Sequence, residues 1–197
     1  MRHMFHVLCG VCFLVCLGAP WGEASGGAGQ APATAGAQRT DPNLEALRAK
    51  AQERMALDRG LLSSDEFREL ESLYQSANRD LRSPDAKAKL KEVVRRFPQS
   101  NRAGCAVLYL AQLSEGTARE EYLKSAIARY SNSWYGDGVQ VGARARAQLA
   151  VSYANSGRGD EAQKLAQELQ ALFPSAVDHS GVRLAEGLKM LKSQRSP

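Results

Sequence analysis

Over most of the chain, apolar residues recur at the three- and four-residue spacing that places them on one face of a helix. Residues 139–174 show this pattern most clearly, as two apolar stripes in succession. The first stripe contains Leu149 and Tyr153, and the second runs through residues 162–173. Gly157 lies between them, and glycine disfavours the interior of a helix. The pattern predicts two helices folded back on each other as a hairpin.

The same spacing predicts helices on both sides of this hairpin, within an all-α domain over residues 41–192. The additional predicted helices cover residues 42–60, 63–81, 83–97, 103–113, 117–130 and 180–192. The ends of two of these helices repeat each other. The apolar residues at the end of the helix over 83–97 recur 33 positions later at the end of the helix over 117–130: Leu90, Val94 and Phe97, then Leu123, Ile127 and Tyr130. An insertion at residues 134–141 interrupts the next repeat. Because a hairpin cannot bury its apolar face alone, we expect a right-handed solenoid of about eight helices.

One continuous core should run through the stacked hairpins. Its predicted members are Leu90, Val94, Phe97, Leu110, Leu123, Ile127, Tyr130, Leu149, Tyr153, Ala162 and Phe173. Helix starts are indicated by the capping-box pattern, in which Ser, Thr or Asp precedes Glu or Gln by three residues. The pattern occurs at Ser63 and Glu66, Thr117 and Glu120, and Asp160 and Gln163.

Several residues of the hairpin stand at the fixed positions of a known repeat. They are Leu149, Ala150, Tyr153, Gly157, Ala162 and Pro174, whereas Arg146 and Ala166 stand where Trp and Phe are commonest. With these residues the chain resembles the tetratricopeptide repeat family, whose pattern is W-x2-L-G-x2-Y, then A-x3-F, then P. The resemblance covers roughly residues 67–176 and describes a divergent form of the repeat.

The resemblance implies that the first helix of each hairpin lines a concave groove that binds peptides or other proteins. The groove positions of the hairpin are occupied by Arg144, Ala147, Val151, Ala154 and Asn155. Members of the family that bind a peptide carboxylate do so through Lys and Asn residues. Ala147 and Val151 occupy those positions in this chain.

Residues 1–24 are typical of a secretory signal peptide, because Arg2 precedes an apolar run that ends near Gly18. The run is too short to span a bilayer, so we expect no integral membrane span after cleavage. Its three cysteines follow bulky residues where a lipobox needs Gly or Ala, so we expect no lipid anchor. Residues 25–40, rich in Gly, Ala and Pro, predict a flexible linker, and residues 193–197 a disordered tail. The protein should be periplasmic or secreted, and it resembles exported tetratricopeptide proteins of the bacterial cell envelope.

Composition argues against a catalytic or metal-binding role. After removal of the signal peptide, Cys105 is the only cysteine and His179 the only histidine that remain, so no Cys/His metal site of the usual spacing can form. We expect Cys105 to pack as a small hydrophobe, and we expect no cofactor. The net charge is +5, but the basic residues are interleaved with acidic ones along the helices. This distribution disfavours a nucleic-acid partner.

The loop at residues 131–142 is the most unusual segment of the domain. Its glycines match neither phosphate-binding pattern, and no strand precedes it. Trp134 and Tyr135 either close the core around the insertion or contact a partner, and Asp137 is expected to cap the following helix. We therefore predict an exported, non-catalytic scaffold that binds a protein or peptide. The predicted contacts are Trp134, Tyr135, Asp137, Arg144, Val151 and Asn155; the alternative is an envelope enzyme or its accessory subunit using Cys105 or acidic loop residues.

Cleavage of the signal peptide is expected after Ala24, because small residues at positions 22 and 24 satisfy the signal peptidase. N-terminal sequencing of the protein purified from its own cells should therefore begin at Ser25. A mature chain that begins at a lipidated cysteine, or that keeps Met1, would contradict this prediction.

Overall fold

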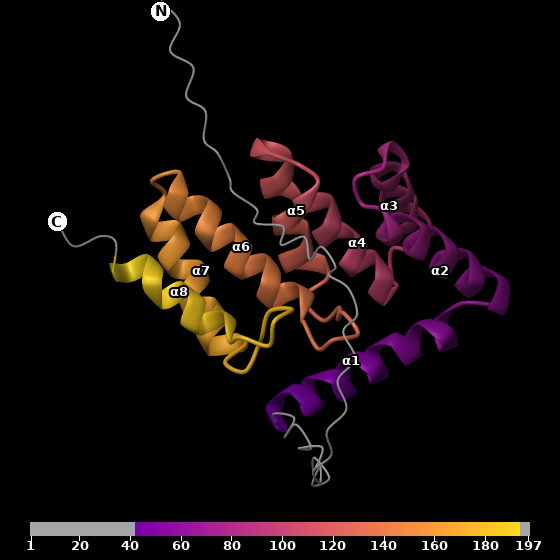
Figure 1. The fold of residues 1–197 in the computed structure, drawn as a ribbon, viewed down its shortest axis with the longest axis horizontal. Coiled ribbons are helices and arrows are strands. Elements are labelled where there is room, and N and C mark those ends of the chain that lie inside the picture. The colour runs from indigo at the N-terminus through magenta and orange to yellow at the C-terminus, as the bar shows by residue number, and fades with distance from the viewer. Residues whose placement is uncertain (1–41, 194–197) are drawn as a thin grey trace, which may run out of the picture. The chain divides into compact units, whose positions relative to one another are not determined.

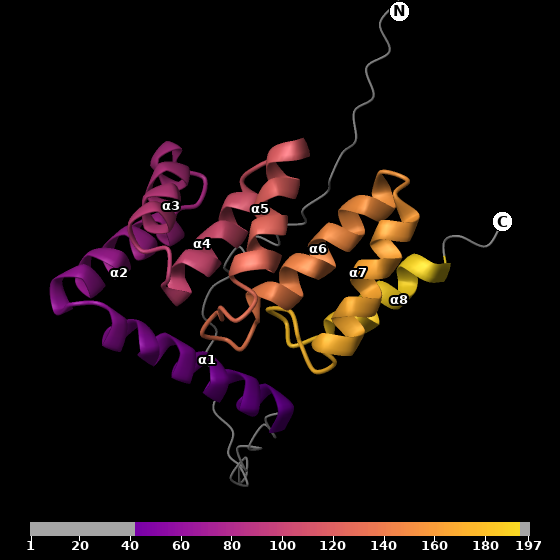
Figure 2. The same ribbon diagram turned by 180° about the vertical axis from the view of Figure 1, so that it is seen from behind.

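The structure, a computed structural model, describes residues 42–193, and this part of the chain is all-α (Figures 1 and 2). Its eight helices are α1 (Pro42–Leu61), α2 (Ser64–Arg79), α3 (Pro84–Arg96), α4 (Asn101–Gln112), α5 (Gly116–Arg129), α6 (Val141–Asn155), α7 (Gly159–Leu172) and α8 (Leu184–Ser193). The predicted all-α fold with about eight helices is confirmed. The predicted signal peptide and linker, and residues 194–197 of the predicted tail, lie outside the described residues.

Neighbouring helices in the sequence are also neighbours in space. From α2 to α7 each helix packs along the next, and α2, α4, α6 and α8 also contact one another in that order. Figures 1 and 2 show the resulting series of hairpins side by side. This arrangement is compatible with the predicted solenoid.

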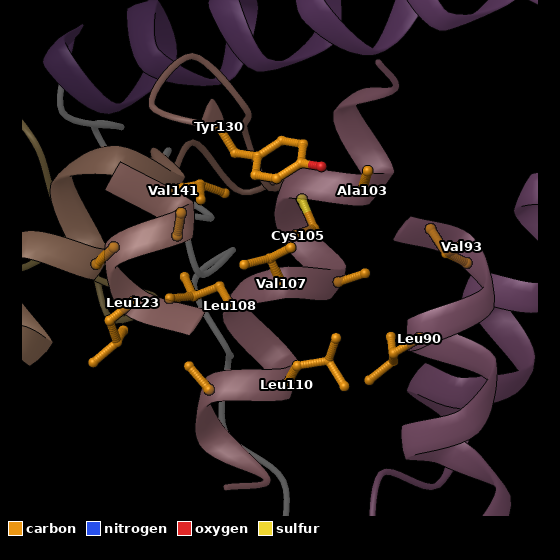
Figure 3. Close-up of a cluster of buried hydrophobic side chains, with 14 of the residues drawn as sticks. Leu90, Val93, Ala103, Cys105, Val107, Leu108, Leu110, Leu123, Tyr130 and Val141 are labelled. Carbon is orange, nitrogen blue, oxygen red and sulfur yellow. The ribbon is translucent and has the colours of Figure 1, made fainter. Parts of the chain in front are cut away.

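The core lies between the hairpins, with α4 at its centre (Figure 3). Nine of the twelve residues of α4 are buried, because this helix of small apolar residues has neighbours on several sides. Most of the predicted core residues lie in one cluster with it, including Leu90, Leu110, Leu123 and Leu149. Phe173 packs instead in a second cluster, which α6, α7 and α8 share. The core is therefore divided near the C-terminal hairpin.

One of the three predicted capping boxes is present. The hydroxyl of Ser63 accepts the N–H of Glu66 at 3.3 Å, and the Ser63 N–H donates to the Glu66 carboxylate at 2.8 Å. The predictions at Thr117 and Asp160 were wrong, since α5 and α7 begin one residue earlier, at glycines, without a side-chain cap. Glu120 accepts instead from the Tyr153 hydroxyl at 2.8 Å, a tertiary partner that local sequence does not reveal.

The predicted insertion forms a turn before α6, and a second turn of the same kind precedes α8. At residues 133–141 the chain makes a short turn in which the Val141 N–H donates to Ser133 O at 2.9 Å. The Leu184 N–H donates to Ala176 O at 3.0 Å in the same way, so α8 begins at Leu184 and not at Ser180 as predicted. Each turn needs a glycine with positive φ, at 96° in Gly138 and 80° in Gly181.

Helix α1 lies across the loops that precede α4, α6 and α8 (Figure 1). Near its start, Leu47 and Ala51 form a buried cluster with Trp134 and Val177, one residue from each of the two repeated turns. Near its end, Asp58 is 2 % exposed, and its carboxylate accepts the Asn101 N–H at 2.8 and 2.9 Å. Burial raises the pKa of Asp58 despite this hydrogen bond and the nearby Arg54.

Asn101, at the start of α4, is fully buried and connects three segments. Its backbone N–H binds Asp58 of α1, while its side-chain amide makes two hydrogen bonds to the backbone of Trp134. The amide oxygen accepts the Trp134 N–H at 2.7 Å, and the amide nitrogen donates to Trp134 O at 2.8 Å. Helix α1, helix α4 and the first repeated turn are thereby held in one register.

The close approach of α4 to the first turn predicts a strong effect at Gly104. A Cβ atom there would lie 2.2 Å from Ser133 Oγ and 2.4 Å from Ser133 Cβ, too close for either residue to accommodate by side-chain rotation. Gly104→Ala should lower the free energy of unfolding by about 1–3 kcal/mol, as overpacking usually does. Gly60→Ala is the matched control, because a Cβ atom at Gly60 would meet open space. This substitution should raise the free energy of unfolding by about 0.5–1 kcal/mol, since alanine forms helices better than glycine. Urea denaturation checks both variants, and an equal effect would contradict the close packing.

Candidate functional site

Trp134 and Tyr135 lie inside the protein, with 8 % and 6 % of their surfaces exposed. Trp134 packs under α1, and the Tyr135 hydroxyl donates to Cys105 O at 3.1 Å. Both rings therefore close the core around the insertion, which is one of the two alternatives left open by the sequence. The structure corrects the expectation that these side chains are offered to a partner.

Asp137 does not cap α6, whose N-cap is Gln140. One carboxylate oxygen accepts the Val139 N–H at 3.3 Å, and the other lies 2.7 Å from His179 Nδ1. His179 also packs against the Tyr135 ring, with centroids 5.1 Å apart. Asp137 and His179 thus join the two repeated turns, a connection between residues that are far apart in the sequence.

The other three predicted contacts, Arg144, Val151 and Asn155, line one groove along α6. It consists of two cavities of about 390 and 300 Å³ that share Arg119, Gln148 and Val151 in their walls. The first cavity extends past Asn155 to the turn before α5, and the second extends to α8. The lining residues beyond those named are Glu115, Gly116, Ala147, Ser152, Ser156, Asp178, Val182, Arg183, Leu184, Gly187 and Leu188.

The polar side chains at the centre of the groove have no partner in the described part of the chain. Arg119 Nε, Arg144 Nε and Gln148 Oε1 are covered from solvent, and each forms no hydrogen bond there. Arg146, two residues from Arg144 on the same helix, pairs with Glu168 of α7 at 3.2 Å. Burial of an unpaired polar group is unfavourable, so the lining of the groove contains polar groups that the fold itself does not satisfy.

Apolar side chains are also exposed in the groove. Val151 is 39 % exposed and Val182 is 52 % exposed, whereas Ala147, Leu184 and Leu188 are buried beside them. A surface of valines between arginines can bury apolar area on binding and can also pair with charge. The groove therefore has the composition of an interaction surface.

A second hollow, of about 460 Å³, lies between α1, α2 and α4. Three of its charged groups have partners, because Arg102 Nε donates to Glu71 Oε1 at 2.6 Å and Asp58 accepts the Asn101 N–H, while the Arg59 guanidinium lies over the Phe67 ring. Burial opposes the ionisation of Glu71, but the ion pair with Arg102 outweighs it and lowers the pKa of Glu71. This hollow offers less to a ligand than the groove along α6.

Cys105 is fully buried, and its thiol lies 3.4 Å from Trp134 O as a hydrogen-bond donor. Burial raises the pKa of the thiol to about 12. At neutral pH the thiol is therefore protonated, and a protonated thiol is a poor nucleophile. The prediction of a buried small residue at this position is confirmed.

Sequence reasoning missed four side chains of the groove: Arg119, Gln148, Val182 and Arg183. The sequence does indicate that Arg144 is unpaired, because no acidic residue occurs between Asp137 and Asp160. Arg144 therefore has no ion-pair partner on its own helix. Arg119 gave no such signal, since it is followed directly by two glutamates.

Among residues 42–193, no helix is both long and apolar enough to cross a bilayer. Comparison of the chain with protein-family models, curated proteins and solved structures finds no match. The functional argument therefore depends on the groove itself.

The position of Trp134 predicts a structural role that can be separated from binding. Trp134→Ala should lower the free energy of unfolding by about 3–5 kcal/mol, because it leaves a cavity beneath α1. Val151→Ala, in the groove, is the control and should change stability by no more than about 0.5 kcal/mol. Thermal unfolding followed by circular dichroism measures both, and a Trp134→Ala protein of unchanged stability would restore the ring to the list of possible contacts.

Proposed function

We propose that this protein is a non-catalytic scaffold that holds a protein or peptide partner in the groove along α6. One observation carries the proposal: unpaired Arg119 and Arg144 lie beside the exposed Val151 and Val182 in a single groove. Arginine is among the side chains in which interface energy is concentrated, and the valines supply apolar area that binding can bury. Arg119 comes from α5 and Arg144 from α6, so both arginines stand on helices that pack along each other.

The same proposal includes a tetratricopeptide-like solenoid exported to the cell envelope. The contacts of α2, α4, α6 and α8 along one side of the stack support the repeat, and the residues matching the repeat pattern lie in α6 and α7. Export is supported by the apolar N-terminal segment in the sequence. The alternative, an envelope enzyme or its subunit, gains no support from Cys105 or from Asp137, whose side chains are engaged within the fold.

Site-specific photocrosslinking in the cells that produce the protein tests this proposal. A benzophenone amino acid at Val151 should yield discrete adducts with a partner, because this side chain faces the groove. The same amino acid at Lys91, exposed on α3, is the control and should yield few adducts or none. Adducts at Lys91 but not at Val151 would place the partner elsewhere, and the absence of adducts at both would contradict the scaffold function.

A further inference from the structure

The unpaired arginines of the groove differ from the other cations that pack in this part of the stack. Arg102 pairs with Glu71 at 2.6 Å, Arg146 with Glu168 at 3.2 Å and Arg158 with Glu120 at 2.9 Å. Arg119 and Arg144 are also half-buried, yet within residues 42–193 neither has a carboxylate partner. A half-buried guanidinium without an anion is unfavourable, and an incoming carboxylate relieves that cost without breaking an existing bond.

The acidic side chains that line the groove do not form ion pairs with Arg119 or Arg144. Asp178 accepts the N–H groups of Ser180 and Val182 at 2.8 and 3.0 Å through Oδ1, so this oxygen stabilises its own turn. Asp178 forms no ion pair with Arg119 or Arg144. Glu115 is exposed and lines the cavity that Arg119 also lines, but the two side chains form no ion pair. Arg183 adds a third cation to the cavity that contains Arg119 and Arg144. The centre of the groove is therefore complementary to negative charge.

The shape of the groove indicates an elongated ligand. The two cavities share walls and form one trough across α6, from the turn before α5 to the side of α8. A small anion would fill only its centre and would leave Val151 and Val182 exposed. An extended segment can place an acidic side chain between the arginines and an aliphatic one on these valines.

We infer that the groove recognises an internal, extended protein segment in which acidic side chains stand next to aliphatic ones. The carboxylate pairs with Arg119 and Arg144, and the aliphatic side chain packs on Val151 and Val182. The inference rests on the proposed scaffold function and adds the chemistry of its partner. A terminal carboxylate, a free small anion and a nucleic acid are the competing occupants.

Selection from a displayed random peptide library tests the inference. The full chain is the target, and each twelve-residue peptide is fused through its C-terminus, so that none presents a free terminal carboxylate. Enriched sequences should contain Asp or Glu beside Leu, Ile or Val. Amidated synthetic copies should bind with a dissociation constant that Arg119→Gln and Arg144→Gln each raise at least tenfold. Higher salt should weaken binding, because exposed ion pairs are screened.

Arg79→Gln is the matched control, because Arg79 is exposed at the end of α2, away from the groove, and its replacement changes the net charge equally. It should leave the affinity within about twofold. Unchanged circular dichroism of all three variants shows that folding is retained.

Three results would overturn the inference while leaving the scaffold function to the crosslinking experiment at Val151. They are an enriched set without acidic residues, binding insensitive to both arginine substitutions, and the recovery of no peptide. Displacement of the peptide by an oligonucleotide, or binding that requires a free C-terminal carboxylate, would assign the groove to a competing occupant.

Discussion

The hydrogen bonds of one buried residue, Asn101, join α1, α4 and the first repeated turn. The side chain pairs with both backbone groups of Trp134, as a neighbouring strand would, while the adjacent N–H is bound by Asp58. Buried polar groups that are fully satisfied specify one arrangement, because any shift leaves several of them unpaired at once. Helix α1, the first turn and α4 therefore meet at one residue, in addition to the apolar contacts of α1 with Trp134 and Val177.

The position of α1 determines which surfaces of the other helices and loops are covered and which stay uncovered. Helix α1 covers the loops before α4, α6 and α8 and buries Trp134 and Val177. The groove, in contrast, is lined by α6, α8 and the start of α5, and α1 contributes no residue to it. The aromatic residues of the insertion thus pack inside the stack, whereas the valines and arginines of the groove stay outside the area that α1 covers.

Arginine has two distinct roles in the same helix. Arg146 stacks over the Phe173 ring at 5.0 Å and pairs with Glu168, so it connects α6 to α7. Arg144 lies on another side of α6, where no acidic residue of the described chain reaches it. Identical side chains differ in role because pairing within the fold consumes the hydrogen-bonding capacity of one and not of the other.

The sequence by itself determined the helical class, the approximate number of helices, most of the core and the burial of Cys105, because these follow from local periodicity and side-chain chemistry. The resemblance to the repeat family placed Arg144, Val151 and Asn155 on the groove side of one helix. Only the tertiary structure decided that Trp134 is covered by α1, that the turn recurs before α8, and that Arg119 joins Arg144. Those outcomes depend on contacts between residues distant in the chain, for which the spacing of apolar residues contains no information.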